Sequence, residues 1–336
     1  MTAVTIDRVS IVFGDRPEAA LAAMDRGLTR AEVEAETGQI LGVHDCSLDV
    51  AEGEIVVLMG LSGSGKSTLL RAVNGLAPVV RGEVRIDGGR GMVSVTRAGP
   101  RALRRLRQRR VAMVFQQFGL LPWRRVGENV GLGLELAGVP RAQRREAVDR
   151  QLELVGLSDW ADRPVDELSG GMQQRVGLAR AFATEAPILL MDEPFSALDP
   201  LIRARLQDEL LALQARSGRT ILFVSHDLDE AFKLGGRIAI MEGGRIVQCG
   251  TAAEILDRPA SGYVAEFVAH MNPLGVLTAG DAAVEGHAEG APVPASMPVR
   301  DLMALCAARG GAIPVERDGQ IVGVVDRRIL LERLAR

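Results

Sequence analysis

The feature that most restricts the fold of this chain is a glycine-rich segment at residues 60–67, which reads GLSGSGKS. It matches the pattern G-x-x-x-x-G-K-[ST] in full. Its context also fits, because the apolar run 56–59 precedes it and residues 68–71 continue as a helix. Such a strand–loop–helix unit directs backbone N–H groups and the positive end of a helix at one point. The segment therefore predicts a phosphate-binding loop in an α/β fold.

The side chains of this loop indicate which phosphate compound it binds. Lys66 would bridge the β- and γ-phosphates of a nucleotide, and the Ser67 hydroxyl would ligate Mg²⁺. The glycines allow the backbone to approach the phosphates closely. We therefore expect ATP and Mg²⁺ as ligands. The predicted ATP-binding residues of the loop are Gly60, Leu61, Ser62, Gly63, Ser64, Gly65, Lys66, Ser67 and Thr68.

Two carboxylates follow a second apolar run. Residues 188–191 are Ile-Leu-Leu-Met, and Asp192 and Glu193 come directly after them. At the end of a buried strand the pair would face the phosphates, where Asp192 can hold Mg²⁺ and Glu193 can act as general base on a water molecule. By itself such a pair could equally cap the next turn. Beside a phosphate-binding loop, we favour hydrolysis of ATP.

A third segment, Ser-Gly-Gly at residues 169–171, opens a predicted helix. The N-terminus of a helix attracts anions, so this segment is a second possible phosphate contact. Taken alone, it would more often be an ordinary helix start. Its place shortly before Asp192 favours the phosphate contact.

Strands alternate with helices along most of the chain, which implies an α/β fold with a largely parallel sheet. The span of about 118–175 is mostly helical and is predicted to be a subdomain inserted between two strands. Thr29 and Glu32 form a capping box for a short helix. Strands are expected at 3–13, 46–50, 54–59, 111–115, 188–191 and 220–225, and helices at 16–39, 66–74, 141–155, 170–183 and 200–217.

Composition excludes several classes of protein. The net charge of −3 gives no global attraction to nucleic acid. The three cysteines have no metal-ligand spacing and favour a reducing compartment. No secretory leader is recognisable at the start, and no apolar run reaches the roughly 18 residues of a membrane helix. The arginines between residues 101 and 110 are interpreted as a solvated helix face rather than a binding patch.

The C-terminal part has a different composition. Residues 272–296 are rich in Gly, Ala and Pro and are interpreted as a linker, followed by a small unit at 297–336. In that unit we expect a helix at 299–308, strands at 312–316 and 320–325 around an Asp318-Gly319 turn, and a helix at 327–334.

Taken together, residues 3–270 resemble the nucleotide-binding subunit of an ABC transporter. The segment 168–172 reads LSGGM and resembles the LSGGQ signature of that family, with Met172 as the departure. The resemblance implies a P-loop NTPase fold of the ABC ATPase type over residues 1–271. This fold has a RecA-like core, an antiparallel β subdomain at its edge and an inserted helical subdomain.

The resemblance also implies roles for single residues. Gln116 matches the Q-loop glutamine, with Gln117 as the competing choice, and His226 matches the switch histidine. Phe13 matches the aromatic residue that stacks on adenine, and a place in the core is its alternative. The implied sets are Lys66, Gln116, Glu193 and His226 for catalysis, Ser67, Gln116 and Asp192 for the metal, Ser169, Gly170, Gly171 and Gln173 for the signature, and Asp199 for the D-loop.

The mechanism implied by the family is a head-to-tail homodimer. Each ATP would lie between the P-loop of one copy and residues 169–171 of the other, so the signature acts in trans. Hydrolysis would separate the two copies and drive membrane permease subunits, which receive solute from an external binding protein. The chain would then lie on the cytoplasmic face of the inner membrane as a peripheral subunit, without a nucleic-acid partner.

The type of transporter is suggested by a helical insertion at residues 15–39, which is similar to that of quaternary-amine importers. Residues 121–124 and the short C-terminal region are closer to choline systems. Uptake of choline or glycine betaine is the favoured function, with proline possible. An importer for another amino acid or a polyol is the alternative, and a non-transport ABC ATPase is disfavoured because the chain has one cassette and no zinc spacing.

Two further segments have family counterparts. Residues 118–123 match the groove that receives a coupling helix of the permease, although Trp123 could instead lie in the core of the helical subdomain. Residues 296–336 resemble a single CBS motif. Since such motifs normally work in pairs, a passive dimerisation tail is favoured over a sensor.

Overall fold

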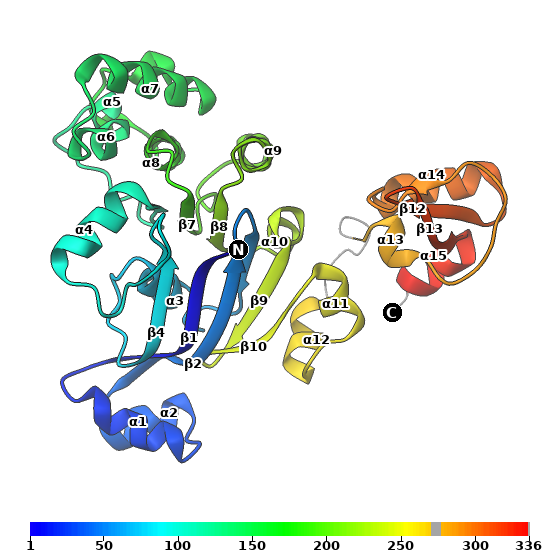
Figure 1. Ribbon diagram of the computed structural model, residues 1–336, viewed down its shortest axis with the longest axis horizontal. Coiled ribbons are helices and arrows are strands. Elements are labelled where there is room, and N and C mark those ends of the chain that lie inside the picture. Colours follow the sequence, from blue (N-terminus) through cyan, green and yellow to red (C-terminus); the bar gives the residue numbers. More distant parts are fainter. Residues whose placement is uncertain (270–276, 335–336) are drawn as a thin grey trace. The chain divides into compact units, whose positions relative to one another are not determined.

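The computed structural model of the chain describes residues 1–269 and 277–334 (Figure 1). It divides into two units. One holds Met1–His226 and Ile240–Ile246, and the other holds Asp227–Ala239 and Val247–Arg336. Among the described residues, no helix has the length and apolar character needed to cross a bilayer. The predicted boundary between residues 271 and 272 lies outside the described residues.

A six-stranded sheet in the order β10-β9-β3-β8-β7-β6 forms the centre of the fold. Strands β3, β8, β7 and β6 are parallel to one another, which confirms the predicted α/β fold. Every residue of β3, β7 and β8 is buried, so these strands have continuous apolar sequences. The strands are β3 (Ile55–Met59), β6 (Val111–Val114), β7 (Ile188–Asp192), β8 (Thr220–Val224), β9 (Arg237–Glu242) and β10 (Arg245–Gly250).

Helices connect these strands, and their ends follow local signals. Asp199 accepts a hydrogen bond from the Ile202 N–H (3.0 Å) at the start of α9, and Gly218 ends that helix in the left-handed region. The bounds predicted for α8 and α9 are confirmed. The helices are α3 (Lys66–Val73), α4 (Pro100–Arg109), α8 (Gly170–Ala183), α9 (Pro200–Ser217) and α10 (Leu228–Leu234).

An antiparallel sheet in the order β2-β1-β4-β5 forms the edge subdomain that the family resemblance implied. Strand β2 begins at Ile40, earlier than the predicted start at residue 46. The early part pairs with the end of β1, where Leu41 lies opposite Val12. The strands are β1 (Thr2–Phe13), β2 (Ile40–Ala51), β4 (Arg81–Asp87) and β5 (Met92–Ser94).

The insertion between β1 and β2 forms two helices, α1 (Pro17–Asp25) and α2 (Arg30–Thr37), at one end of this sheet (Figure 1). The predicted capping box at Thr29 and Glu32 is present. The insertion has its own small core, whose buried members are Val12, Ala20, Ala23, Met24, Val33 and Leu41.

Buried valines and leucines and the polar residue Asn129 stabilise the inserted helical subdomain. Asn129 is fully buried, and its amide bonds the backbone of Leu121 in both directions (2.7 and 3.1 Å). Trp123 is 78% exposed, so the alternative that placed it in the subdomain core is wrong. The elements are α5 (Val126–Val130), α6 (Leu132–Leu136), α7 (Arg141–Leu154), 3-10 turns at Ser158–Trp160 and Val165–Glu167, and α8.

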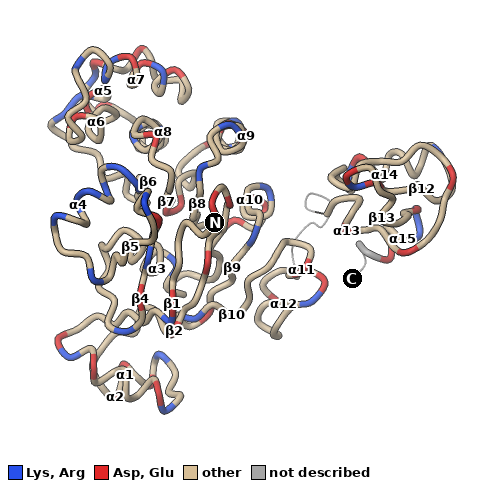
Figure 2. Tube along the Cα trace, in the orientation of Figure 1, with Lys and Arg blue, Asp and Glu red and all other residues tan. Residues whose placement is uncertain are grey.

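The arginines around α4 divide into two groups, and Figure 2 shows basic residues along this helix. Arg107 donates to the backbone oxygens of Asn74 (2.9 Å) and Gly75 (3.0 Å), and Arg110 pairs with Asp87. The remaining four, Arg101, Arg104, Arg105 and Arg109, are exposed, as expected for a solvated face.

The second unit contains a three-stranded sheet in the order β11-β12-β13 with helices around it. From α14 onward its elements run α-β-β-α, as predicted for 299–334, and β11 precedes them within the predicted linker. The elements of this unit from residue 252 are α11 (Ala252–Asp257), α12 (Gly262–Val268), α13 (Ala279–Ala282), β11 (Val293–Pro294), α14 (Val299–Arg309), β12 (Ile313–Arg317), β13 (Gln320–Val325) and α15 (Arg327–Leu334).

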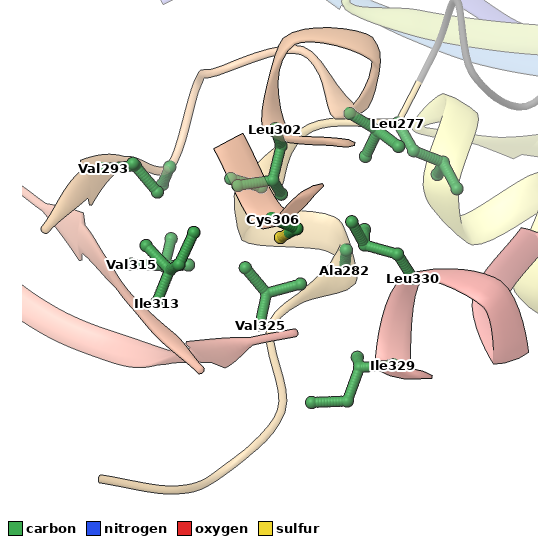
Figure 3. Close-up of a cluster of buried hydrophobic side chains, with 13 residues drawn as sticks. Leu277, Ala282, Val293, Leu302, Cys306, Ile313, Val315, Val325, Ile329 and Leu330 are labelled. Atoms are coloured by element: carbon green, nitrogen blue, oxygen red, sulfur yellow. The ribbon is translucent and has the colours of Figure 1, made fainter. Parts of the chain in front are cut away.

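The predicted linker at 272–296 is wrong over residues 277–296, which belong to this folded unit. Leu277, Ala282 and Val293 are buried in its core together with Leu302 of α14 (Figure 3). Strand β11 also pairs with β12, where Val293 lies opposite Val315. Composition does not distinguish the two cases here, because small apolar residues are common both in linkers and in tightly packed cores. Residues 272–276 lie outside the described residues.

Candidate functional site

The glycine-rich loop joins the end of β3 to the start of α3, as predicted. At two of its glycine positions no other residue fits. Gly60 has φ +140°, and a Cβ there would lie 2.2 Å from the Met241 carbonyl oxygen. Gly65 has φ +98°, and its Cβ would lie 2.5 Å from the Gly42 oxygen. A side chain at either position would clash with backbone, so the loop depends on glycine for its shape.

Lys66 is buried at the first position of α3. Its Nζ donates hydrogen bonds to the carbonyl oxygens of Gly60 (2.8 Å) and Leu61 (2.9 Å). Burial lowers the pKa of the Lys66 ammonium, while the carboxylates of Glu193 and Asp192 act in the opposite direction. The lysine is thus held inside the loop by two backbone oxygens, next to two acidic side chains.

Asp192 is fully buried at the end of β7, and both of its carboxylate oxygens have partners. The Ser67 hydroxyl donates to Oδ1 (2.6 Å), and Arg71 Nη2 donates to Oδ2 (3.1 Å). A buried carboxylate is stable only when it is paired or hydrogen-bonded. The sequence interpretation did not include Arg71. Its spacing of four residues from Ser67 on α3 was the available signal, because such residues share a helix face.

Glu193 lies beside two other predicted residues. Its Oε2 accepts a hydrogen bond from Gln116 Nε2 (3.2 Å) and lies 3.3 Å from His226 Nδ1. The three side chains follow β6, β7 and β8, which are neighbouring parallel strands. Gln116, not its neighbour Gln117, therefore reaches the carboxylate. Glu193 has φ +48°, a left-handed conformation that costs a non-glycine residue about 1–3 kcal/mol.

The unusual backbone at Glu193 is held by residues that the sequence interpretation left out. Gln174 of α8 is buried, and its Nε2 donates to the Glu193 carbonyl oxygen (3.1 Å). Its Oε1 accepts from the Ala197 N–H (2.9 Å), and Ser196 Oγ donates to the same Glu193 oxygen (3.1 Å). Gln174 follows the signature segment directly, but a lone glutamine in a helix gives no sequence signal of this contact.

A pocket of about 650 Å³ combines the loop with these side chains. Phe13 is not among its lining residues. It is 41% exposed at the end of β1, and both its ring and the Thr68 methyl group lie against Gly42. Phe13 is therefore near the start of α3 and is not a core residue. The pocket is lined by Arg30, Ser62, Gly63, Gly65, Lys66, Ser67, Thr68, Gln116, Glu193 and His226.

The signature residues lie outside this pocket. Ser169 caps α8 by accepting from the Met172 N–H (3.4 Å), and Gln173 Nε2 donates to the Leu168 oxygen (3.1 Å). Ser169 and Gly170 are exposed, and a Cβ at Gly170 would meet no atom within 4 Å, so the helix start is open there, whereas a Cβ at Gly171 would lie 3.1 Å from the Ala197 oxygen. Within one copy of the chain, the structure does not bring Ser169, Gly170, Gly171 or Gln173 to the P-loop.

The oxygen atoms around Asp192 suit a magnesium ion. Mg²⁺ is usually held by one or two protein oxygens together with phosphate and water, rather than by a cage of protein ligands. The Ser67 hydroxyl and the Asp192 carboxylate are hard oxygen donors already in contact. Among residues 1–269 and 277–334, no group of three or more His, Cys, Asp or Glu side chains could hold a metal.

Comparison with known proteins gives a family and a solved structure. A family described as "ABC transporter" matches residues 43–196, a span that contains the P-loop and Glu193. A solved dimeric structure of the ATP-binding cassette MJ0796, in a post-hydrolysis state with ADP and Pi, has a TM-score of 0.63 and 30% sequence identity to this chain. That match covers 74% of this chain and 98% of the cassette.

Two curated relatives match more of the chain. The glycine betaine/proline betaine transport system ATP-binding protein ProV of Salmonella typhimurium is 50% identical over 272 residues, which are 81% of this chain and 67% of that protein. The trimethylamine N-oxide transport system ATP-binding protein TmoW of Ruegeria pomeroyi is 45% identical over 325 residues. The second match covers 96% of this chain and 94% of TmoW, so it extends through the insertion and the C-terminal unit.

Proposed function

Because the chain belongs to the family of ATP-binding subunits of quaternary-amine ABC importers, we propose that it hydrolyses ATP to energise uptake of a small quaternary ammonium solute. Choline or glycine betaine is favoured as this solute, and proline is possible. The observation that carries the ATPase function is the contact of Gln116, Glu193 and His226 at the P-loop pocket. The sequence relatives carry the solute class.

The pocket suggests how each residue takes part in hydrolysis. The backbone N–H groups of the loop and Lys66 would hold the phosphates, since both converge on the start of α3. Ser67, Asp192 and the amide oxygen of Gln116 would hold Mg²⁺, which would supply positive charge next to the phosphates when bound. The hydrogen bond from Gln116 Nε2 to Glu193 leaves that amide oxygen available.

Glu193 would act as general base on the attacking water. Its Oε2 accepts a hydrogen bond from Gln116 Nε2, and Glu193 lines the same pocket as the P-loop, which supports a position beside the attacking water. His226 Nδ1 lies 3.3 Å from that oxygen, close enough to orient the base. Its side chain is 63% exposed and lines the pocket, which supports a contact with the phosphate. Proton transfer would then run from the water to Glu193.

A second copy would complete the site. The signature residues lie outside the pocket of their own chain, and the open start of α8 is suited to an anion bound by another copy. We propose that Ser169, Gly170, Gly171 and Gln173 act in trans, with Asp199 near the dimer interface. Phe13 would stack on adenine at the other end of the nucleotide.

The proposed partners and location follow from the transporter family. The exposed Trp123 and its neighbours would receive the coupling helix of a permease, because an exposed apolar patch suits a partner surface. The chain would work at the cytoplasmic face of the inner membrane, with an external binding protein delivering solute. Residues 1–271 would form the ATPase domain, and the predicted 297–336 unit, together with 277–296 that share its core, would form a passive tail that favours dimerisation.

Reconstitution tests this function in two steps. The chain is purified with its permease in proteoliposomes containing the binding protein, and ATPase activity is measured with choline, glycine betaine, proline or trimethylamine N-oxide. Magnesium-dependent basal hydrolysis tests the enzyme assignment. Stimulation by choline, glycine betaine or proline supports the proposed cargo. Stimulation by trimethylamine N-oxide alone, or by none of the four, would overturn it while leaving the ATPase assignment in place.

A further inference from the structure

The helical insertion contributes one cation to the nucleotide pocket. Arg30, the first residue of α2, is partly buried and lines the pocket beside the P-loop and Lys66. Its Nη1 donates a hydrogen bond to the Gly63 carbonyl oxygen. In the part of the chain that the structure describes, its guanidinium forms no ion pair. Its other N–H donors are therefore not committed to a carboxylate, although it lies next to the phosphate-binding loop.

The position of Arg30 is fixed by contacts elsewhere in the insertion. Helices α1 and α2 pack on β1 and β2 around the buried Met24 and Val33. Arg81 of β4 pairs with Asp25 through both carboxylate oxygens (2.7 and 2.9 Å). The insertion is thus attached to the edge sheet at two independent places, and α2 begins at a defined distance from the loop.

Helix stability does not account for an arginine at this position. A cation in the first turn opposes the helix dipole, and the N-terminus is already capped by Thr29 and Glu32. Arg26, which follows the end of α1, behaves differently, since it pairs with Glu36 within the insertion. Arg30 is directed at the P-loop instead.

We propose that Arg30 is a further nucleotide-binding residue, which contacts the polyphosphate of the ATP bound in the P-loop of its own chain. A guanidinium binds phosphate oxygens through charge-assisted hydrogen bonds, which are stronger than its bond to a neutral carbonyl. When nucleotide binds, the guanidinium would keep or exchange its bond to Gly63 and add a bond to phosphate. The proposal rests on the proposed ATPase function, and it gives the insertion a role in the site.

The test is nucleotide binding by the full chain, measured by calorimetry with ATP, ADP and AMP. The variants are Arg30→Gln, Arg30→Lys and, as the matched control, Arg26→Gln, which removes the same charge from the same insertion outside the pocket. Arg30→Gln should raise the Kd for ATP and ADP about fivefold to tenfold, as expected for one partly exposed charged contact. AMP binding should be unchanged, and Arg30→Lys should retain part of the affinity.

Specific results would overturn the proposal. One is equal ATP affinity of Arg30→Gln and Arg26→Gln, with Arg30→Lys also unchanged. Another is an equal loss for AMP and ATP, which would show that the contact is not to the polyphosphate. Circular dichroism and thermal unfolding establish that the variants are folded. If the unmodified chain bound no ATP, the proposed function would fail too, whereas normal ATP binding with no effect at Arg30 would remove only this inference.

Discussion

Replacing Gln174 by Leu should slow hydrolysis without weakening ATP binding. Gln174 is 1% exposed and does not line the nucleotide pocket. Its amide donates one hydrogen bond to the Glu193 carbonyl (3.1 Å) and accepts one from the Ala197 N–H (2.9 Å), and its Nε2 also makes a weak contact with Ser196 Oγ at the 3.5 Å limit. Leucine has a similar volume, so the change removes both bonds with little cavity formation.

The size of the effect follows from these two bonds. A typical intramolecular hydrogen bond contributes about 1 kcal/mol net, so the free energy of unfolding should fall by about 2 kcal/mol. Ser196 still donates to the Glu193 oxygen, and Ala197 is exposed and can bond to water, which limits the loss. Glu193 has a left-handed backbone, so it should leave its productive position in part of the population. A cost of about 1.4 kcal/mol in the transition state corresponds to a tenfold lower kcat.

Steady-state ATPase assays and urea unfolding measure these quantities on the same preparations. Ser196→Ala is the matched comparison, because it removes the serine bond to the Glu193 oxygen and a weak contact with Gln174 but leaves the Gln174 bonds to Glu193 and Ala197 in place. It should show a smaller loss of kcat. A Gln174→Leu variant that lost stability but kept kcat within twofold of the unmodified chain would refute the reasoning. A rise in KM of the same size as the fall in kcat would also refute it, because the residue would then affect binding.

Three further predictions follow from the same structure. Glu193→Gln should lower kcat by at least about a hundredfold and leave ATP binding intact, with an ATP-bound dimer accumulating on size exclusion; near-normal turnover would exclude the base role. Arg71→Met leaves the buried Asp192 carboxylate with one partner fewer, so unfolding should need about 1–2 kcal/mol less, after allowing for the 44% exposure of the arginine side chain; unchanged urea unfolding would contradict this. Burial raises the pKa of the Cys46 thiol to about 11, so a thiol reagent at pH 8 should modify the exposed Cys249 in the native chain and reach Cys46 only after unfolding, which mass spectrometry can follow.

Much of the central sheet could be predicted because its signals are local. Continuous apolar runs define the buried strands, and capping residues such as Ser169 and Asp199 define helix starts to the residue. The early start of β2 could not be seen, because Gly42 and His44 interrupt the apolar pattern. There the pairing with β1 sets the strand, and pairing partners far apart in the sequence leave no local signal.

The residues of the pocket were predictable where a motif fixes their chemistry. Lys66, Ser67, Asp192 and Glu193 follow from two short segments at strand ends. Their roles stay predictions, although the structure brings them to one place. Arg30 could not be inferred in the same way, because its distance to Gly63 depends on how the insertion packs against the edge sheet.

The contacts of α8 suggest how binding of a nucleotide at one place in this fold could control hydrolysis at another. The helix begins at the signature segment, and a few residues later Gln174 bonds the backbone of Glu193. An anion at the open start of α8 would favour one position of this helix. A shift of α8 would then move the Glu193 backbone through the buried Gln174 side chain that bonds to it. In our proposal the anion belongs to ATP held by a second copy. Binding energy from one nucleotide would then align the base that acts on the other, which requires the two sites of a dimer to work together.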